Sequence, residues 1–288
     1  MAFDTAYPAQ AALGECPLWC GQSQRLWWLD IEAPAIHCFD PATGANTTLP
    51  MDENVGCIAL RAGGGFIAGL RSGLWLLDDR GRKEKLIAAP QRDTTISRFN
   101  DGRADPWGRF WAGTIHEPRD RPDAMLCRVD ADLSCTRVAD DIKVSNGLAF
   151  SPDRKWMYHS DTPAHVIYRY PLDAGGTPGP REVFHQFPLG HGRPDGAAVD
   201  ADGFYWSALY EGGRVVRISP AGEIVAEVPV PARCPTMCAF GGSDLRTLYV
   251  TSARHGRPAE ELADWPASGN LFAMRVDVPG LPEPRFGG

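Results

Sequence analysis

The chain has 288 residues, of which 43% are hydrophobic and 23% charged, a balance that excludes a disordered or fibrous protein. Its 29 basic and 36 acidic residues give a formal net charge of −7 and form no basic block, which excludes nucleic-acid binding driven by phosphate neutralisation. The 31 glycines, 25 prolines and 9 tryptophans indicate many tight turns between short strands and argue against long helices.

The start of the chain predicts a cytoplasmic protein without a membrane partner. Residues 1–15 lack the basic region and apolar run of a signal peptide, and no apolar run approaches the ~20 residues needed to span a bilayer. Eight cysteines are too few for a disulfide scaffold. Two pairs, Cys16 with Cys20 and Cys234 with Cys238, share a spacing that thiolate metal sites also use, but buried, unreactive thiols are the simpler interpretation.

In chain order, six segments of the sequence resemble one another. Each has an apolar run, a turn rich in Asp or Gly, and a second run rich in aromatic residues. They begin at intervals of 40 to 49 residues, near Pro17, Cys57, Asn100, Asn146, Asp195 and Pro235. This period, with four short strands per unit, predicts an all-β, six-bladed β-propeller with four-stranded antiparallel blades around a central channel, formed by residues 1–288 as a single domain. A β-sandwich is the alternative.

The clearest copies of the repeat begin at Asn100 and Asp195. In both copies an Asp follows five residues later, a Gly eight residues later and a Trp eleven residues later. These residues are Asp105 and Asp200, Gly108 and Gly203, and Trp111 and Trp206. Further strands are predicted over Ala124–Val129, Val166–Tyr170, Arg214–Ile218 and Asn270–Val276, and a short helical turn over Pro258–Trp265.

The first position of each repeat predicts where the chemistry lies. The innermost strand of a propeller blade lines the channel, so residues at the same repeat position converge on the axis. This position holds Gly56, Asn100, Asn146 and Asp195, with Glu15 one residue out of register. Carboxylates and carboxamides are poor choices for an apolar core, and a hard divalent cation would relieve their repulsion. Taken singly, Asn-Gly and Asp-Gly pairs are turn signals. Their shared register favours a site.

Two arginines accompany these positions. Arg98 precedes Asn100 by two residues and so lies on the same side of an extended strand. Its guanidinium can hold a substrate oxygen or pair with an acid. Arg193 has the same offset from Asp195, but its preceding residues resemble a loop, which makes Arg193 the weaker candidate.

His116 and Glu117 follow the aromatic strand of the third repeat. Either they reach over the mouth of the channel or they belong to a solvated loop. The sequence has no G-x-S-x-G, H-E-x-x-H or G-x-x-x-x-G-K-[ST] motif, and no cysteine is framed as a nucleophile. Serine hydrolases, cysteine hydrolases and zincins are therefore disfavoured.

These residues lie in runs that resemble the SMP-30/gluconolactonase/luciferin-regenerating family, in the family's order and across nearly the whole chain. The runs are Gly14-Glu15-Cys16-Pro17, Arg98-Phe99-Asn100-Asp101-Gly102, Ser145-Asn146-Gly147-Leu148, Pro194-Asp195-Gly196 and Cys238-Ala239-Phe240-Gly241-Gly242. The resemblance is nearest to the bacterial sugar-lactonase branch. It implies a six-bladed propeller with one divalent metal in the central channel. Cys16 is a departure, because the family usually has Gly after the Glu, and it could alter the local turn.

The resemblance also implies roles for the residues at the axis. By this resemblance Asn100 and Asn146 face the metal and Arg98 contacts the substrate, and the expected metal ligands are Glu15, Asn146 and Asp195. The expected substrate-binding residues are Arg98, Asn100 and, from its place near the mouth of the channel, Glu117. Asp195 is the expected general base as well, because a carboxylate at the metal's edge can accept a proton. Oxygen ligands leave the metal open among Ca²⁺, Zn²⁺, Fe²⁺, Mn²⁺ and Mg²⁺.

The expected activity is metal-dependent hydrolysis of a sugar lactone to its aldonic acid. Gluconolactone, xylonolactone, galactonolactone and arabinonolactone all remain open as substrates. The expected protein is a monomer, because a closed propeller leaves few exposed strand edges. Three alternatives stay open at this point: a phosphotriesterase-like hydrolase in the same cavity, a non-catalytic metal-binding regulatory propeller, and a protein-interaction scaffold.

Overall fold

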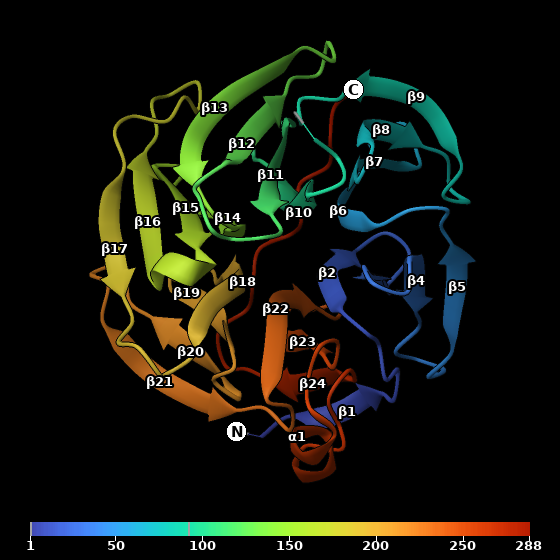
Figure 1. The fold of residues 1–288 in the computed structure, drawn as a ribbon, viewed down its shortest axis with the longest axis vertical. Helices are drawn as coiled ribbons and strands as arrows, with labels where there is room; N and C mark the ends of the chain where they lie inside the picture. Colours follow the sequence, from blue (N-terminus) through green and yellow to red (C-terminus); the bar gives the residue numbers. More distant parts are fainter. Residues whose placement is uncertain (1, 92) are drawn as a thin grey trace.

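The computed structural model of the protein describes residues 2–91 and 93–288. Six four-stranded antiparallel sheets are arranged in a ring around a central axis (Figure 1). The innermost strands are β2 (Gly14–Cys20), β6 (Val55–Leu60), β10 (Ser97–Ala104), β14 (Ser145–Phe150), β18 (Arg193–Val199) and β22 (Cys234–Gly241). Each of these strands contacts the innermost strand of both neighbouring sheets. The predicted six-bladed β-propeller is confirmed.

The remaining strands of each blade follow outward from the axis. The second strands are β3 (Arg25–Asp30), β7 (Phe66–Leu70), β11 (Phe110–His116), β15 (Trp156–Asp161), β19 (Tyr205–Tyr210) and β23 (Thr247–Ala253). The third strands are β4 (Ala35–Phe39), β8 (Gly73–Leu77), β12 (Ala124–Val129), β16 (Val166–Pro171), β20 (Arg214–Ile218) and β24 (Leu271–Arg275). The outermost strands are β5 (Asn46–Pro50), β9 (Lys83–Ala88), β13 (Cys135–Ile142), β17 (Glu182–Gln186), β21 (Ile224–Pro229) and β1 (Asp4–Tyr7).

Burial decreases from the axis to the rim of each blade. Every residue of the innermost strand β14 is buried, whereas the outermost strands β5 and β21 are mostly exposed or half-buried. An inner strand packs on both faces and needs continuous apolar or hydrogen-bonded side chains, whereas an outer strand carries polar residues along its free edge.

The repeated Asp and Trp found in the sequence stabilise the hairpin between the first two strands of a blade. In the third blade, Asp105 Oδ2 accepts a hydrogen bond from the indole Nε1 of Trp111 at 2.8 Å, and Oδ1 accepts the backbone N–H groups of Trp107 and Arg109. In the fifth blade, Asp200 accepts the indole N–H of Trp206 at 2.9 Å. Both carboxylates are fully buried. Each one satisfies an indole N–H that would otherwise be costly to bury.

Two helical turns complete the secondary structure. The 3-10 turn η1 (Thr162–Ala164) follows β15, and α1 (Ala259–Asp264) lies within the predicted Pro258–Trp265 turn. No helix among the described residues is long and apolar enough to cross a membrane.

The ring is closed by the first strand of the chain. β1 pairs antiparallel with β24, so the last blade contains β22, β23, β24 and β1. Phe3, just before β1, is buried in the apolar cluster of this blade with Phe272 and Met274. The two ends of the fold are therefore held in one sheet.

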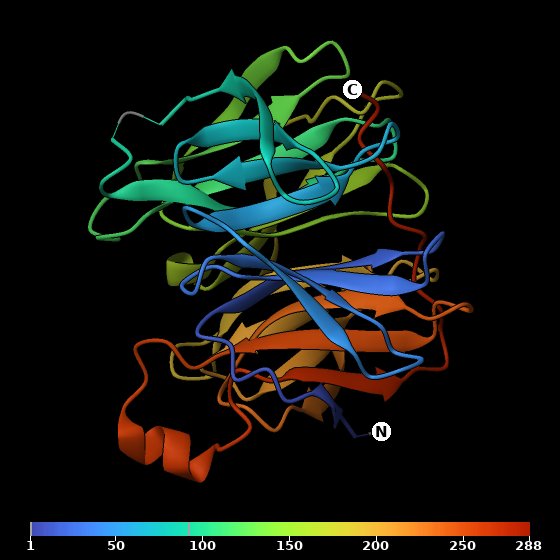
Figure 2. The same cartoon turned by 90° about the vertical axis from the view of Figure 1, so that its right-hand side faces the viewer.

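Residues 276–288, which we call the C-terminal strap, run along the face opposite to α1 (Figure 2). The strap bonds to turns of several blades: Gly280 N–H donates to Leu245 O at 2.8 Å, and Phe286 N–H donates to Leu60 O at 2.8 Å. Phe286 is fully buried. The strap thus covers the far end of the channel, where the innermost strands end.

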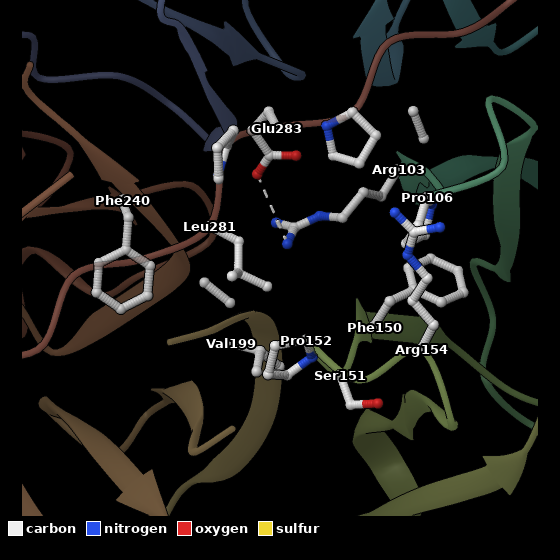
Figure 3. Close-up of a pocket in the computed structure, with 14 residues that line it drawn as sticks. Arg103, Pro106, Phe150, Ser151, Pro152, Arg154, Val199, Phe240, Leu281 and Glu283 are labelled. Carbon is white, nitrogen blue, oxygen red and sulfur yellow. Dashed lines mark ion pairs between the residues drawn. The ribbon is translucent and has the colours of Figure 1, made fainter. Parts of the chain in front are cut away.

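A cavity of about 330 Å³ lies between the strap and these strand ends (Figure 3). Its walls are mainly apolar, with Phe150, Phe240 and Leu281 among them. Its charged groups include Arg103 and Glu283, whose charged atoms lie 3.7 Å apart. None of the predicted site residues lines this cavity.

Candidate active site

Each innermost strand carries a β-bulge near its start, at or beside the repeat position that the sequence singled out. Gly56, Asn100 and Asp195 are among the residues that the bulge leaves unpaired. Glu15 and Asn146 directly precede the bulge of their strands. A bulge bends its strand and re-aims a side chain. The position that reads as a turn signal in the sequence is therefore the place where four innermost strands, β2, β10, β14 and β18, direct a polar side chain toward one end of the channel.

A second cavity, of about 230 Å³, opens at this end of the channel. All six of the predicted site residues line it. They are Glu15, Arg98, Asn100, Glu117, Asn146 and Asp195. They come from β2, β10, β14, β18 and the turn after β11. The structure therefore brings together side chains that are up to 180 residues apart in sequence.

Two buried carboxylates face this cavity. Glu15 is 8% exposed and Asp195 is 5% exposed. Among residues 2–91 and 93–288, no side-chain donor lies within hydrogen-bonding distance of either carboxylate, and the backbone N–H of Cys16 approaches Glu15 at 3.4 Å. Burial, followed by repulsion from the nearby Asp101 carboxylate, raises the pKa of Asp195 to about 8. Burial, followed by repulsion from Asp195 and Asp101, also raises the pKa of Glu15 well above its ordinary value.

Asp101 is a third buried acid close to these two. Its Oδ2 accepts the backbone N–H of Leu148 at 2.9 Å, and its Oδ1 accepts that of Gly102 at 2.8 Å. It therefore ties the bulge of β10 to the bulge of β14. Its backbone bonds distinguish it from Glu15 and Asp195, whose oxygens are left for another partner.

A line of hydrogen bonds runs across three blades beside the carboxylates. Arg98 Nη1 donates to Asn100 Oδ1 at 2.9 Å, and Asn100 Nδ2 donates to Asn146 Oδ1 at 2.9 Å. Asn146 Nδ2 then donates to Thr162 Oγ1 at 2.8 Å, and this hydroxyl donates to Pro194 O at 2.8 Å. The direction of donation fixes both amides with their oxygens toward the arginine side. An amide oxygen has two lone pairs, so Asn146 Oδ1 can accept from Asn100 and still bind another group.

Arg98 and Glu117 belong to a network of charges at the mouth. Arg98 is 4% exposed, and its nitrogens lie 3.5 Å from Glu117 and 3.9 Å from Glu32. Arg71 donates two hydrogen bonds to Glu117, at 2.7 and 3.1 Å. These bonds, with Arg98 nearby, outweigh the effect of partial burial and lower the pKa of Glu117. Glu117 therefore lies beside Arg98 in the lining of the cavity.

The lining of the cavity differs from the sequence-based expectation at several residues. His116 does not line it; this side chain is 1% exposed and bonds to Asp120 at 2.7 Å, because it is the last residue of β11 and points the other way. Arg193, which the sequence left as the weaker candidate, is the first residue of β18 and lines the cavity. Glu32, Arg119 and Thr162 line it as well.

Cys16 occupies a position that suits glycine. Its backbone φ is 47°, in the left-handed region that residues with a Cβ rarely adopt. Its side chain is 3% exposed, and its Sγ accepts the N–H of Ile58 at 3.3 Å. Burial raises the pKa of this thiol to about 12. The departure from the family pattern is therefore accommodated by packing, and Glu15 keeps its place in the cavity.

The remaining cysteines do not point to a metal site. All eight are unpaired, and Cys16, Cys20, Cys234 and Cys238 are buried. Within residues 2–91 and 93–288, no group of three or more His, Cys, Asp and Glu side chains is arranged to hold a metal. The predicted ligand set differs from such a group, because two of its members are carboxylates and the third is an amide.

The residues at the axis nevertheless fit a hard cation. Glu15 and Asp195 are buried, lie near enough to repel each other, and lack a cationic or strong hydrogen-bonding partner among the described residues. Carboxylate and amide oxygens are the ligands that Ca²⁺, Mg²⁺ and Mn²⁺ prefer. A single divalent charge would compensate the two acids.

Known proteins share this fold and sequence pattern. Residues 13–254 match the SMP-30/Gluconolactonase/LRE-like region. The chain belongs to this family. A relative from Pseudomonas putida named 6-deoxy-6-sulfogluconolactonase is 57% identical over 279 residues, covering 96% of each protein. The pentonolactonase XacC of Haloferax volcanii is 36% identical over 283 residues, covering 94% of this chain and 93% of the relative.

A solved structure extends the likeness to three dimensions. The calcium-binding protein regucalcin from Agrobacterium tumefaciens has a TM-score of 0.93 and 30% identity, and the match covers 98% of this chain and 96% of that chain. The family identified from the sequence runs, and its propeller fold, are thus both confirmed.

Proposed function

We propose that the protein is a lactonase that hydrolyses a sugar lactone to the aldonic acid in the cavity formed by Glu15, Arg98, Asn100, Glu117, Asn146 and Asp195. The observation that supports this most is the pair of buried carboxylates of Glu15 and Asp195, which have no side-chain hydrogen-bond donor among residues 2–91 and 93–288 and share the cavity with the Arg98 guanidinium. The chain is also 57% identical to a protein named as a sugar lactonase. The pentonolactonase relative supports the same reaction class.

Asp195 is the proposed general base. Its carboxylate accepts the proton of the water that attacks the lactone carbonyl, and it returns that proton to the ring oxygen as the ester bond breaks. A carboxyl whose pKa is raised to about 8 is mostly protonated at neutral pH, so Asp195 can act as a base only when a nearby positive charge lowers its pKa.

A divalent cation held by Glu15, Asn146 and Asp195 would supply that charge and, when bound, would polarise the lactone carbonyl. Arg98 and Asn100 would hold the oxygens of the substrate, with Arg98 stabilising negative charge on the carbonyl oxygen. Thr162 positions Asn146 through its hydroxyl, and Glu117 orients Arg98 from the mouth. The regucalcin named as calcium-binding supports a divalent cation in this chain, and leaves its identity open.

We also propose that the chain works as a single-domain cytoplasmic monomer. β1 completes the last blade, so no blade of the ring lacks its outer strand. The relatives named for a sulfonated hexonolactone and for pentonolactones support a substrate among the five- and six-carbon lactones.

A lactone panel tests the proposal. The purified protein, the chelator-treated protein, and the Asp195→Asn and Asp202→Asn variants are assayed on five- and six-carbon lactones and on a phosphotriester. We expect lactone hydrolysis that chelator abolishes, a loss of at least about 10²-fold in Asp195→Asn, and normal activity in Asp202→Asn, whose carboxyl is exposed on the opposite face. Cation binding without turnover of any lactone would instead favour a regulatory protein, and turnover of only the phosphotriester would favour the other hydrolase.

A further inference from the structure

Two arginines at the cavity have no role in the proposed reaction. Among the described residues, three arginines line the cavity. The guanidinium of Arg98 already makes hydrogen bonds within the protein, because its Nη1 donates to Asn100 Oδ1 and to Phe99 O. Arg71, just behind the rim, donates both of its terminal nitrogens to Glu117. Arg119 and Arg193 remain.

Arg119 lines the cavity, and its side chain has no side-chain partner among the residues that the structure describes. It is exposed and lies in the turn after β11, where its backbone N–H donates to His116 O at 2.9 Å. Its φ of 57° is unfavourable for a residue with a side chain. Its guanidinium makes no hydrogen bond or ion pair with any side chain of residues 2–91 and 93–288. A strained, unpaired arginine that lines a polar cavity is available to a ligand.

The guanidinium of Arg193 has a hydrogen-bond partner for only some of its N–H groups among the described residues. Its Nη2 donates to Glu211 Oε2 at 2.8 Å, and its guanidinium lies 5.2 Å from the centre of the Tyr210 ring. Its Nε is enclosed and has no hydrogen-bond partner among the described residues. Glu211 is shared with Arg257, which donates to its other oxygen at 2.7 Å. One carboxylate therefore serves two guanidinium groups.

Both arginines also face the floor of the cavity. Arg119, Arg193 and Asp195 all line the same cavity of about 230 Å³, and Arg193 precedes Asp195 by two residues in β18. A substrate whose carbonyl lies at Asp195 can therefore extend toward both guanidinium groups.

We propose that Arg119 and Arg193 form an anion subsite that binds a sulfonate or phosphate group on the terminal carbon of the lactone substrate. This inference rests on the proposed lactonase function and names the substrate class of that site. Guanidinium groups bind tetrahedral oxyanions through paired N–H donors, and a sulfonate presents three such oxygens. The relative named for 6-deoxy-6-sulfogluconolactone acts on a hexonolactone whose terminal carbon carries this group.

The test is a ratio of specificities. kcat/KM is measured for 6-deoxy-6-sulfogluconolactone, 6-phosphogluconolactone and unsubstituted gluconolactone with the cation-loaded wild type and with the Arg119→Gln, Arg193→Gln and Arg154→Gln variants. The last removes an exposed arginine from the cavity on the opposite face, so its ratios should equal those of the wild type. We expect the ratio of anionic to neutral substrate to fall about 10- to 100-fold in each of the first two variants, as expected for loss of hydrogen bonds to a charged group.

Two further measurements keep the result interpretable. Arg193→Lys retains the charge without the planar donors and should lose part of the ratio if bidentate binding matters. Titration of the wild type and of Arg119→Gln with 6-deoxy-6-sulfogluconate and with gluconate reports binding without turnover. Preference for the phosphorylated over the sulfonated lactone would support the subsite and identify phosphate as its anion.

The failures are distinguishable. If the wild type hydrolyses lactones but shows the same kcat/KM for neutral and anionic substrates, or if neither arginine variant changes the ratio, the anion subsite is wrong and the lactonase stands. If no lactone is hydrolysed and the anionic acid binds no better than gluconate, both proposals are wrong. Selective binding of the anionic acid without any turnover would retain the subsite and overturn the lactonase.

Discussion

Asn100 and Asn146 join two neighbouring blades at the axis: the Nδ2 of Asn100 donates to the Oδ1 of Asn146 at 2.9 Å. These residues lie at the bulges of β10 and β14, and each amide is held on its other side, by Arg98 and by Thr162. The two amides are therefore oriented by hydrogen bonds that they accept from, and donate to, other groups of the protein. Pre-oriented groups lose little freedom on binding, which favours both affinity and geometry.

The orientation of Asn146 should depend on Thr162. We expect Thr162→Val, which keeps the side chain's shape, to leave Asn146 Nδ2 and Pro194 O without their partner and to cost about 1–3 kcal/mol of stability. If Asn146 is a ligand, cation affinity should also fall about 10- to 100-fold. Thermal denaturation and cation titration measure the two effects, with Thr47→Val, exposed on β5, as the control. Unchanged cation affinity would mean that Asn146 is not a ligand.

A divalent cation should stabilise the fold through the buried acids. A ligand present at 100 times its Kd raises the free energy of unfolding by about 2.7 kcal/mol. We expect Tm to rise when Ca²⁺, Mn²⁺ or Zn²⁺ is added to chelator-treated protein, and this rise to disappear in Glu15→Gln and in Asp195→Asn. Glu223→Gln, which removes an exposed carboxylate, should keep it. A rise of equal size in all variants would place the cation elsewhere.

The raised pKa of Asp195 predicts how stability depends on pH in the cation-free protein. The folded state holds the proton up to about pH 8, whereas an unfolded chain releases it near its ordinary pKa of 3.8. Stability from this group is therefore present at low pH and is lost as pH rises through about 8, with a slope of up to about 1.4 kcal/mol per pH unit.

Denaturant unfolding of chelator-treated protein between pH 5 and 8 tests this expectation. Asp195→Asn should flatten the decline and be more stable than the wild type at pH 8, because it removes a charge that burial and Asp101 disfavour. Asp4→Asn, exposed on β1, should follow the wild-type curve. A wild type that gains stability over this range would contradict the raised pKa.

The blades could be predicted from sequence because their signal is local. Asp105 and Trp111 are six residues apart and their hydrogen bond closes one hairpin, and the same pair recurs in the fifth blade as Asp200 and Trp206. The closure of the ring had no such signal. β1 pairs with β24, from the opposite end of the chain, and nothing in Asp4–Tyr7 specifies that partner.

The residues of the candidate site divide in the same way. Asn100, Asn146 and Asp195 share a repeat position, so their register in the repeat is sufficient to group them. Thr162 and Arg119 lie in turns between strands, where length and conformation differ from blade to blade. Only the three-dimensional arrangement could place these two in the cavity.

The C-terminal strap should contribute stability without acting on the candidate site. Phe286 is fully buried against the second blade and bonded on both sides, through its N–H to Leu60 O and through its carbonyl to the N–H of Ala62, each at 2.8 Å. Replacing a buried Phe by Ala removes its apolar contacts and leaves a cavity, at a cost of about 3–5 kcal/mol. We therefore expect Phe286→Ala to lower Tm by on the order of 10 °C. Leu189→Ala, at a side chain that is 80% exposed, should change stability by less than about 0.5 kcal/mol.

Because the strap covers the end of the channel opposite to Asp195, kcat/KM of Phe286→Ala measured well below its Tm should match the wild type. A selective loss of kcat/KM in this variant, with stability intact, would show that the two ends of the channel are coupled.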